Sequence, residues 1–274
     1  MNKKVIVCLL ICVVSAMFVI LNTDHHCAKN IIRGIESDYI SKNDFEQIVK
    51  KNKKGIDAME YSTKILEAFD LVNYTPLCYA CKKGDYSKVK ILLENGSDPN
   101  VIDGTIGRSP LLWALESGQS SRYKISKLLL AAGADPCLVD TRGYNALYES
   151  LVIYGDENVS CQLYSSFDLF NEICNSTTDY NDPRGIDTIL GRAATYGNVR
   201  AMKYILNNNV CGINTQSECG RTALMSCVYK YDNSEICTFL IELGADKRIK
   251  DCNGYTAYDY AVKYKRTKCI KLLK

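Results

Sequence analysis

Apolar residues recur with a helical period in the segment from Thr75 to Asn100, which predicts two short helices. Thr75 is a suitable N-cap for the first helix, and Pro76 occupies the first helical position, where its missing N–H costs nothing. Gly84 separates the two helices, and Gly96 ends the second. The predicted apolar stripes are Leu77, Ala80 and Cys81, followed by Val89, Leu92 and Leu93. Such a pair has one apolar surface to bury and therefore requires neighbours of the same kind.

The same pattern recurs along the rest of the chain. Starting from Thr75, the residues that open each first helix follow at intervals of 34, 36, 43, 34 and 34 residues. We call these residues anchors; they are Thr75, Ser109, Asn145, Thr188, Thr222 and Thr256. Residue types that tolerate positive φ stand two positions before most anchors: Asn73, Gly107, Gly143, Gly220 and Gly254. The regular spacing predicts a stack of helix pairs.

The Thr-Pro-Leu signature, the preceding turn and the period resemble the ankyrin repeat, which comprises a β-turn and two helices in about 33 residues. The turns that end the second helices recur in register as Gly96-Ser97-Asp98, Gly133-Ala134-Asp135 and Gly244-Ala245-Asp246. The resemblance covers roughly residues 70–274. It implies an all-α ankyrin-repeat solenoid of about six helix-turn-helix repeats with an N-terminal helical cap.

Two units depart from the regular pattern. The interval of 43 residues after Asn145 indicates an insertion of about ten residues, and insertions in such arrays map to loops. The predicted first helix, Asn145 to Tyr154, is followed by a loop and then by a helix that carries Phe167, Leu169, Phe170 and Ile173. In the next unit Ile186 stands where the turn glycine is expected, so the register over residues 155–190 stays open.

An uncharged apolar run from Val5 to Leu21 follows Lys3 and Lys4. Its 17 residues span about 25 Å as a helix, the lower limit for crossing a bilayer. A cleaved signal peptide and an uncleaved signal-anchor both fit this segment. We favour the anchor because the apolar run continues beyond the small residues at 14–16. The flanking charges then orient the repeats to the extracytoplasmic side; a secreted protein is the alternative.

These patterns divide the chain into four parts: 1–21, a transmembrane signal-anchor or signal peptide; 22–40, a linker; 41–70, an N-terminal helical cap; and 71–274, ankyrin repeats. In the predicted cap, Asn43 or Asp44 opens a helix that carries Phe45, Ile48 and Val49. A second helix is predicted around Met59, Ile65, Leu66 and Phe69.

Composition adds few constraints on function. The chain is 47% hydrophobic and 24% charged, which is typical of a folded protein, and the formal net charge is +3. Acidic and basic residues are interspersed, so no concentrated basic face predicts nucleic-acid binding. Several of the 14 cysteines occupy positions that the repeat predicts to face inward: Cys81, Cys227, Cys237 and Cys269. Others fall in turns and are predicted to be more exposed: Cys137, Cys211, Cys219 and Cys252.

No pattern in the repeats predicts catalysis. Both histidines, His25 and His26, lie in the predicted linker, so no histidine base is available in the repeats, and no metal site or cofactor is expected. Cys78 and Cys81 form a C-x-x-C pair, but a redox motif of this type requires a thiol with a lowered pKa beside a βαβ pattern. Packing is the better explanation for this pair, and a thiol redox protein is kept as the less favoured alternative.

The resemblance places a partner-binding site on the concave surface, formed by turn tips and the exposed side of each first helix. By register the turn positions are Tyr74, Arg108, Tyr144, Arg221 and Tyr255. The helix positions are Lys82, Lys83, Glu116, Tyr196, Tyr229, Lys230, Lys263 and Tyr264. Tyrosine and arginine are the residue types that dominate binding hot spots. Trp113 also lies on a first helix, but its register predicts core packing.

The sequence therefore predicts a non-enzymatic scaffold that is tethered to a membrane by residues 5–21 and binds a protein partner of acidic or mixed charge. The alternative is a secreted ankyrin protein that acts on a host or neighbouring cell. Neither a nucleic acid nor a small-molecule substrate is expected as a partner.

Overall fold

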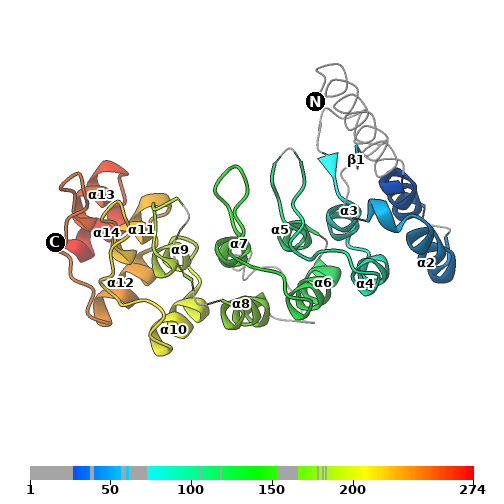
Figure 1. Ribbon diagram of the computed structural model, residues 1–274. Coiled ribbons are helices and arrows are strands. Elements are labelled where there is room, and N and C mark those ends of the chain that lie inside the picture. Colours follow the sequence, from blue (N-terminus) through cyan, green and yellow to red (C-terminus); the bar gives the residue numbers. More distant parts are fainter. Residues whose placement is uncertain are drawn as a thin grey trace, which may run out of the picture. The chain divides into compact units, whose positions relative to one another are not determined.

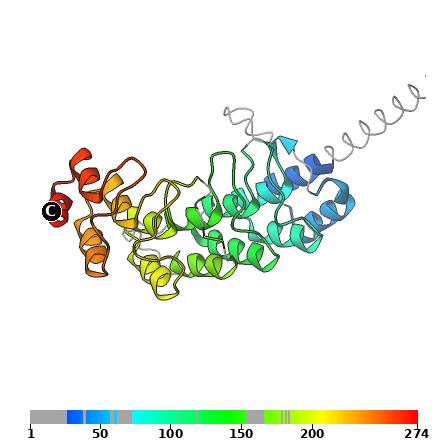
Figure 2. The ribbon, with the colours of Figure 1, turned by 60° about the vertical axis from the view of Figure 1, so that its left-hand side comes forward.

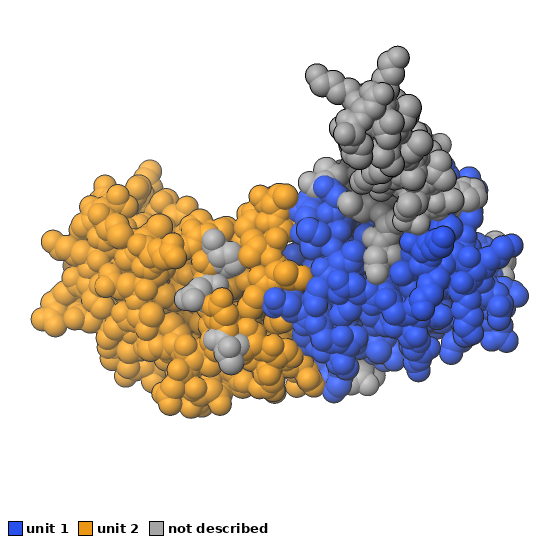
Figure 3. All heavy atoms as spheres, viewed as in Figure 1, with its two compact units in different colours: residues 1–135 blue, residues 136–274 orange. Residues whose placement is uncertain are grey.

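The computed structural model describes residues 27–37, 40–56, 60–61, 73–104, 106–117, 119–152, 166–177, 179–180, 182 and 184–274. The chain divides into two compact units, residues 1–135 and residues 136–274 (Figure 3). Each unit is built from pairs of antiparallel helices, so the predicted all-α repeat fold is confirmed.

The first unit begins with a helical segment over residues 27–36. It continues with α2 (Lys42–Lys51), a short 3-10 helix (Lys53–Gly55), β1 (Glu60–Tyr61), β2 (Asn73–Tyr74), α3 (Pro76–Lys83), α4 (Tyr86–Glu94), α5 (Pro110–Glu116) and α6 (Gln119–Ala131). Helix α3 packs on α5 and helix α4 packs on α6, so the two pairs stack in two layers (Figure 1). Strands β1 and β2 pair antiparallel, with Glu60 opposite Tyr74.

The second unit contains α7 (Ala146–Val152), α8 (Ser166–Asn175), α9 (Ile189–Thr195), α10 (Val199–Asn207), α11 (Ala223–Lys230), α12 (Ser234–Glu242), α13 (Ala257–Lys263) and α14 (Thr267–Leu273). Helices α7, α9, α11 and α13 pack consecutively in one layer, which we call the inner layer (Figure 2). Helix α8 packs on α10, and α12 packs on α14, in the outer layer. In the first unit, α3 and α5 correspond to the inner layer.

All six anchors cap their helices as predicted. The Thr75 hydroxyl accepts a hydrogen bond from the Cys78 amide at 3.3 Å, and the Asn145 side chain accepts one from the Tyr148 amide at 2.9 Å. The remaining anchors make the same bond to the amide three residues later: Ser109, Thr188, Thr222 and Thr256. Each bond satisfies a backbone donor that the helix itself leaves unpaired, which fixes where every inner helix begins.

A recurrent carboxylate organises the turns before the inner helices. In the last turn, Asp251 accepts hydrogen bonds from the backbone amides of Asn253 and Tyr255, both at 2.9 Å. Asp103, Asp140 and Asp182 accept from the amides of their own turns in the same way. In three of these turns a glycine with positive φ follows the aspartate by three residues: Gly143, Gly185 and Gly254. The register left open around Ile186 is thereby resolved, because Gly185 supplies the turn glycine and Ile186 is one additional residue.

The irregular third pair follows the prediction in its described part. Helix α7 is described as far as Val152, so its predicted end at Tyr154 lies outside the described residues, and α8 is described from Ser166. Leu169, Phe170 and Ile173 are buried on α8, as the helical pattern predicts. Residues 153–165, which contain the predicted loop, lie outside the described residues.

Three predictions for the N-terminal part are wrong. Residues 27–36 form a helix and not a linker, because Ala28, Ile31, Ile32 and Ile35 bury one face of it. Helix α2 is capped by Ser41 and not by Asn43 or Asp44, since the Ser41 hydroxyl accepts from the Asp44 amide at 3.2 Å. Glu60 and Tyr61, predicted to be helical, pair with β2 as a strand. Most of that predicted second cap helix lies outside the described residues.

None of the helices in the described part of the chain is both long and apolar enough to cross a membrane. The predicted membrane segment, residues 5–21, lies outside that part.

Lys88 attaches the N-terminal helical segment to the first repeat. Its ammonium group donates to the backbone carbonyls of Ile35 at 3.1 Å and Ser37 at 3.2 Å, and it pairs with Asp85 at 3.0 Å. Only 11% of the Lys88 side chain is exposed. The ammonium therefore satisfies carbonyls at the C-terminal end of the segment, where the helix dipole favours a positive charge.

Replacing Lys88 with Met keeps the aliphatic stem and removes the charge, so Ile35 and Ser37 lose a common donor. We expect this change to lower the free energy of unfolding by about 1–3 kcal/mol and to increase amide hydrogen exchange selectively over residues 27–36. Lys90→Met is the matched control, because Lys90 lies on the same helix, where it makes an exposed pair with Glu94 at 3.7 Å. Equal exchange in both variants would contradict the assigned role.

Candidate functional site

Two of the predicted contact residues in the first unit are buried. Tyr74 has no exposed surface and Arg108 is 4% exposed, so the prediction that they form exposed turn tips is wrong. The Tyr74 ring lies 5.3 Å from Trp113 in an edge-on arrangement and 5.5 Å from Tyr79. Trp113 is buried as predicted, and its indole N–H donates to Asp103 at 2.6 Å. The large rings at positions 79 and 113 explain why Tyr74 is covered.

The charged residues predicted beside these rings pack on them. The Lys82 ammonium lies 4.8 Å from the centre of the Tyr74 ring and 4.9 Å from that of Trp113, and it donates to the Tyr74 hydroxyl. The Arg108 guanidinium lies 4.8 Å from the Trp113 ring and forms an ion pair with Glu116. Lys83 is exposed, 5.6 Å from the Tyr79 ring. Most of the predicted contact groups in this unit therefore stabilise one another.

In the second unit the corresponding positions form an aromatic and basic patch, in which Tyr229, Lys230, Tyr255 and Lys263 are exposed while Tyr260 is buried. We call this patch the tyrosine–cation surface; it comprises Tyr196, Arg221, Tyr229, Lys230, Tyr255, Tyr260, Lys263 and Tyr264. Tyr229 is 42% exposed and Tyr255 is 41% exposed, which is a large exposed fraction for an aromatic side chain. These residues come from the inner helices α11 and α13, from the turns before them and from the C-cap positions of α9 and α13, which Tyr196 and Tyr264 occupy. Neighbouring repeats present the same register positions side by side.

Four tyrosine rings form the centre of this surface. Tyr229 meets Tyr264 edge-on at 5.0 Å and Tyr260 at 6.4 Å, and Tyr255 lies 5.9 Å from Tyr260. Tyr260 on α13 and Tyr264, the C-cap residue of that helix, stack with an angle of 11° between their planes. These contacts fix the rings in place before any partner arrives, so little side-chain entropy is lost when they bind.

Arg221 connects two of these rings. Its guanidinium lies 4.6 Å from the Tyr229 ring and 5.5 Å from the Tyr260 ring. Partial burial lowers the pKa of Arg221, but the hydrogen bond with Tyr260 and the nearby Asp187 carboxylate raise that pKa by more. Arg221 therefore stays positively charged while only part of its side chain is exposed.

Lys230 and Lys263 carry the more exposed charges. The Lys230 ammonium lies 4.6 Å from the Tyr196 ring and 5.2 Å from the Tyr231 ring, and hydrogen bonding to Tyr231 raises its pKa. The Lys263 ammonium lies 5.2 Å from the Tyr255 ring. Neither ammonium forms an ion pair with any carboxylate among the residues that the structure describes. The surface therefore presents positive charge that has no ion-pair partner in the described part of the chain.

Tyr144 lies apart from this surface, in the turn before α7. It is half-buried between Arg142 and Arg184, whose guanidinium groups lie 5.4 and 4.8 Å from its ring. Arg142 is held by an ion pair with the buried Asp140 carboxylate at 3.1 Å. Tyr144 thus contacts both its own turn and the turn before α9 that carries Arg184.

Sequence reasoning missed Tyr260 of this surface and three residues that contact its members: Arg192, Tyr231 and Arg266. Arg192 and Tyr260 both stand four positions after their anchors, one helical turn from the residues that were predicted. Arg192 lies 5.1 Å from the Tyr196 ring. Arg266 donates to the carbonyls of Val228, Tyr229 and Lys230 and so caps the end of α11. The position four after each anchor was a usable signal, because it lies on the same helix face as the predicted residues.

Tyr260 is positioned by Asp251. The Tyr260 hydroxyl donates to the Asp251 carboxylate at 2.6 Å, while the other carboxylate oxygen accepts from the two amides of the last turn. Burial alone would raise the pKa of Asp251, but these hydrogen bonds lower it below the ordinary value. One carboxylate thus joins the turn that carries Tyr255 to the helix that carries Tyr260 and Lys263.

The C-x-x-C pair lacks the properties of a reactive dithiol. Cys78 and Cys81 are both buried. Burial, with a smaller effect from Cys78, raises the pKa of Cys81 well above the ordinary value, whereas an activated thiol requires a lowered pKa. No group of three or more histidine, cysteine, aspartate or glutamate side chains that could hold a metal ion occurs in the described part of the chain.

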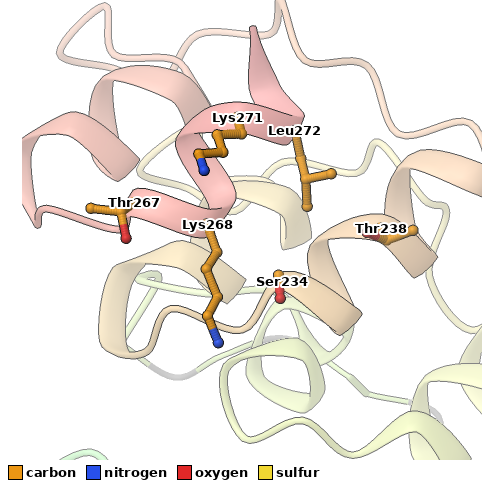
Figure 4. Close-up of a pocket in the computed structure, with 6 residues that line it drawn as sticks. All are labelled: Ser234, Thr238, Thr267, Lys268, Lys271 and Leu272. Carbon is orange, nitrogen blue, oxygen red and sulfur yellow. The ribbon is translucent and has the colours of Figure 1, made fainter.

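A shallow pocket lies on the other side of the second unit, between α12 and α14 (Figure 4). Its volume is about 370 Å³, and its lining residues are Ser234, Thr238, Thr267, Lys268, Lys271 and Leu272. The lining contains hydroxyl and ammonium groups but no histidine or carboxylate that could serve as a general base. We therefore take the tyrosine–cation surface as the candidate site.

The family model described as "Ankyrin repeats (3 copies)" matches residues 17–140, 159–251 and 190–274. Among curated proteins, the human SH3 and multiple ankyrin repeat domains protein 2 is 27% identical over 229 residues. That match covers 82% of this chain, which spans only 11% of the length of that relative.

Two solved structures resemble this fold. The crystal structure of EF0377, an ankyrin repeat protein, has a TM-score of 0.56 and 26% identity and covers 72% of this chain and 95% of its own. A chain from the Bd0816 predatory endopeptidase of Bdellovibrio bacteriovorus in complex with immunity protein Bd3460 has a TM-score of 0.57 and 27% identity, with coverage of 72% and 95%. The whole length of each matched chain is nearly accounted for by this fold.

Replacing Asp251 with Asn removes the negative charge that strengthens its hydrogen bonds with the Tyr260 hydroxyl and with the amides of Asn253 and Tyr255. We expect a loss of about 1 kcal/mol in the free energy of unfolding at pH 7. Because the folded pKa of Asp251 is lowered, its stabilisation is present above the unfolded pKa of about 3.9 and is lost as pH falls through the folded pKa. The difference between the two proteins, measured by denaturant titration, should therefore shrink below about pH 4.

Tyr260→Phe keeps the ring and removes only the hydroxyl, so it should reproduce part of this pH dependence. Tyr258→Phe, on the same helix, is the control and should leave it unchanged. A stability difference that is the same at pH 3 and pH 7 would show that the Asp251 charge does not make this contribution.

Proposed function

The chain belongs to the ankyrin repeat family, and from this premise we propose that it is a scaffold that binds a protein partner on the tyrosine–cation surface of its second unit. Ankyrin repeats bind protein partners and typically serve as non-catalytic interaction modules. The proposal assigns this general role to particular side chains on α9, α11 and α13.

The observation that carries the proposal is the combination of exposed rings with ammonium groups that have no ion-pair partner among the described residues. Tyr229 and Tyr255 are each about two-fifths exposed although both take part in ring contacts. Tyrosine provides a large contact area and a polar hydroxyl at a small entropy cost, and it is enriched at binding hot spots. Large exposed aromatic side chains rimmed by charges are a feature of interaction surfaces.

The charge of the surface indicates the chemistry of the partner. Lys230, Lys263 and Arg221 all lie over tyrosine rings, and the two ammonium groups have no carboxylate partner in the described part of the chain. The acidic groups in the same turn and helix are already engaged, since Asp251 binds Tyr260 and Asp259 caps α13. An acidic segment of a partner would supply the missing counter-charges, with hydrogen bonds from the tyrosine hydroxyls.

The proposal includes a membrane tether and an extracytoplasmic location for the repeats. Support for both comes from the sequence alone: the uncharged run over residues 5–21 and the preceding Lys3 and Lys4. A secreted form, produced by cleavage after the small residues at 14–16, is the alternative within the same proposal.

A photo-crosslinking amino acid at position 229 should capture an acidic protein from a native extract of the source cells, whereas the same group at position 203 on α10 should not. Lys203 is exposed on the outer layer, away from the tyrosine–cation surface. Position 203 is therefore the control for non-specific crosslinking to any exposed surface. Lys230→Glu together with Lys263→Glu should reduce capture at position 229 at least about tenfold, because both exposed cations become anions. Mass spectrometry identifies the captured protein.

The charge-matched control is Lys203→Glu with Lys271→Glu, which makes the same change of net charge on exposed outer helices. If this control loses capture to the same extent, binding depends on net charge and not on the tyrosine–cation surface. If capture at positions 203 and 229 is equal, the placement of the site is wrong.

The membrane tether makes a separate prediction. The mature chain purified from its source should retain residues 5–21 and remain in the membrane fraction after alkaline carbonate washing. Mass spectrometry of the N-terminal peptide decides between the two forms, since a new N-terminus close to residue 17 with protein in the medium would establish the secreted form. Expression of a variant with Val13 and Val19 changed to Arg should release the chain from membranes.

A further inference from the structure

Two cysteines outside the candidate surface lie on neighbouring turns. Cys219 belongs to the turn before α11 and Cys252 to the turn before α13, and both are exposed with free thiols. The other described turn cysteines, Cys137 and Cys211, are only partly exposed. Exposed free thiols are uncommon on protein surfaces because they react, so a neighbouring pair calls for an explanation.

The backbones of the two turns are hydrogen-bonded to each other at these residues. The Cys252 amide donates to the Cys219 carbonyl at 3.1 Å, and the Cys219 amide donates in turn to the Gly185 carbonyl at 3.2 Å. Standard bond lengths then limit the separation of the two Cα atoms to at most about 7 Å. Disulfides in proteins have Cα separations of about 4.4–6.8 Å, so this pair lies in or close to the required range.

The thiol of Cys252 also reaches toward the other turn. Its Sγ lies 3.5 Å from the carbonyl oxygen of Glu218, the residue bonded to Cys219. Gly220 allows this approach, because a Cβ there would come within 2.8 Å of the Cys252 amide nitrogen. The turn thus has no side chain at the one position where it would separate the two cysteines.

We propose that Cys219 and Cys252 are an oxidisable dithiol site that reacts with a low-molecular-weight disulfide to form a disulfide across the last two turns. The Cys219 or Cys252 thiolate attacks one sulfur of the small disulfide, forms a mixed disulfide and releases one small thiol. The second cysteine then attacks the mixed disulfide, and a second small thiol leaves. The two protein thiols are oxidised, the small disulfide is reduced to two thiols, and their protons balance those lost by the cysteines.

The proposed disulfide would join the two turns that also carry Arg221 and Tyr255 of the tyrosine–cation surface. Cys219 lies two residues before Arg221, and Cys252 lies three residues before Tyr255. Closing a loop of about 30 residues restricts the unfolded chain and limits separation of the two turns in the folded one. The dithiol site itself depends only on the turn geometry and does not require that the proposed partner binds.

Oxidised glutathione is the probe that tests the site. The full chain is incubated with it under native conditions, free thiols are alkylated, and disulfide-linked peptides are mapped by mass spectrometry. We expect a peptide pair joined through Cys219 and Cys252, release of two glutathione thiols for each bond, and a rise of roughly 5 °C in the unfolding midpoint that dithiothreitol reverses.

Cys219→Ser and Cys252→Ser are matched variants that leave the turn backbone intact. In each, the remaining cysteine should stop at the mixed disulfide with glutathione, and the unfolding midpoint should not rise. Cys211→Ser should behave as the wild-type chain. The proposal is overturned if the wild-type chain carries glutathione on both cysteines, if either pairs with a different cysteine, or if both stay reduced.

Discussion

Within each unit of this protein, neighbouring inner helices bury their apolar faces against one another, and this contact sets the register of the other elements. Helix α11 lies between α9 and α13, and small residues at the contacts, such as Ala193, Ala223 and Ala257, let the backbones approach closely. A pair that slipped by one residue would rotate its apolar stripe by about 100° and lose that burial. The N-cap bonds of the anchors prevent such a slip, because they define the first turn of every inner helix.

Because the register is common to all repeats, equivalent positions of the inner helices lie on the same face in every repeat. The residue types at these positions determine whether that face is covered by rings or partly exposed. Four positions after the anchor, the first unit has Tyr79 and Trp113, whose rings cover Tyr74 and engage Lys82 and Arg108. In the second unit the equivalent position of α11 is the small, buried Ser226. With no large ring at that position, Arg221 and Tyr229 interact with each other and with Tyr260 and stay partly exposed.

The sequence predicted those features that depend on neighbouring residues in the chain. The anchors and the helix pairs follow from capping residues and apolar periodicity, and both appear in the described structure. The helix over residues 27–36 was missed although Ala28, Ile31, Ile32 and Ile35 have helical spacing, because the polar residues around them suggested a linker. That helix is stabilised by Lys88, which is 51 residues distant from Ser37 in the sequence. No local pattern reports such a contact.

The site was predictable by position but not by exposure. Tyr74 and Tyr255 both stand immediately before an anchor, yet Tyr74 is fully buried and Tyr255 is exposed, since exposure depends on the residues that neighbouring elements contribute. The cysteines obey the same rule. Cys81 and Cys227 lie in the second turn of inner helices and are buried between repeats, whereas Cys219 and Cys252 lie in turns and face solvent. Burial raises the pKa of Cys174 to about 12, so a thiol inside a helix pair stays protonated and acts as a small apolar side chain. The position of a residue in the repeat, together with its neighbours, thus determines whether a tyrosine ring or a thiol is exposed to solvent.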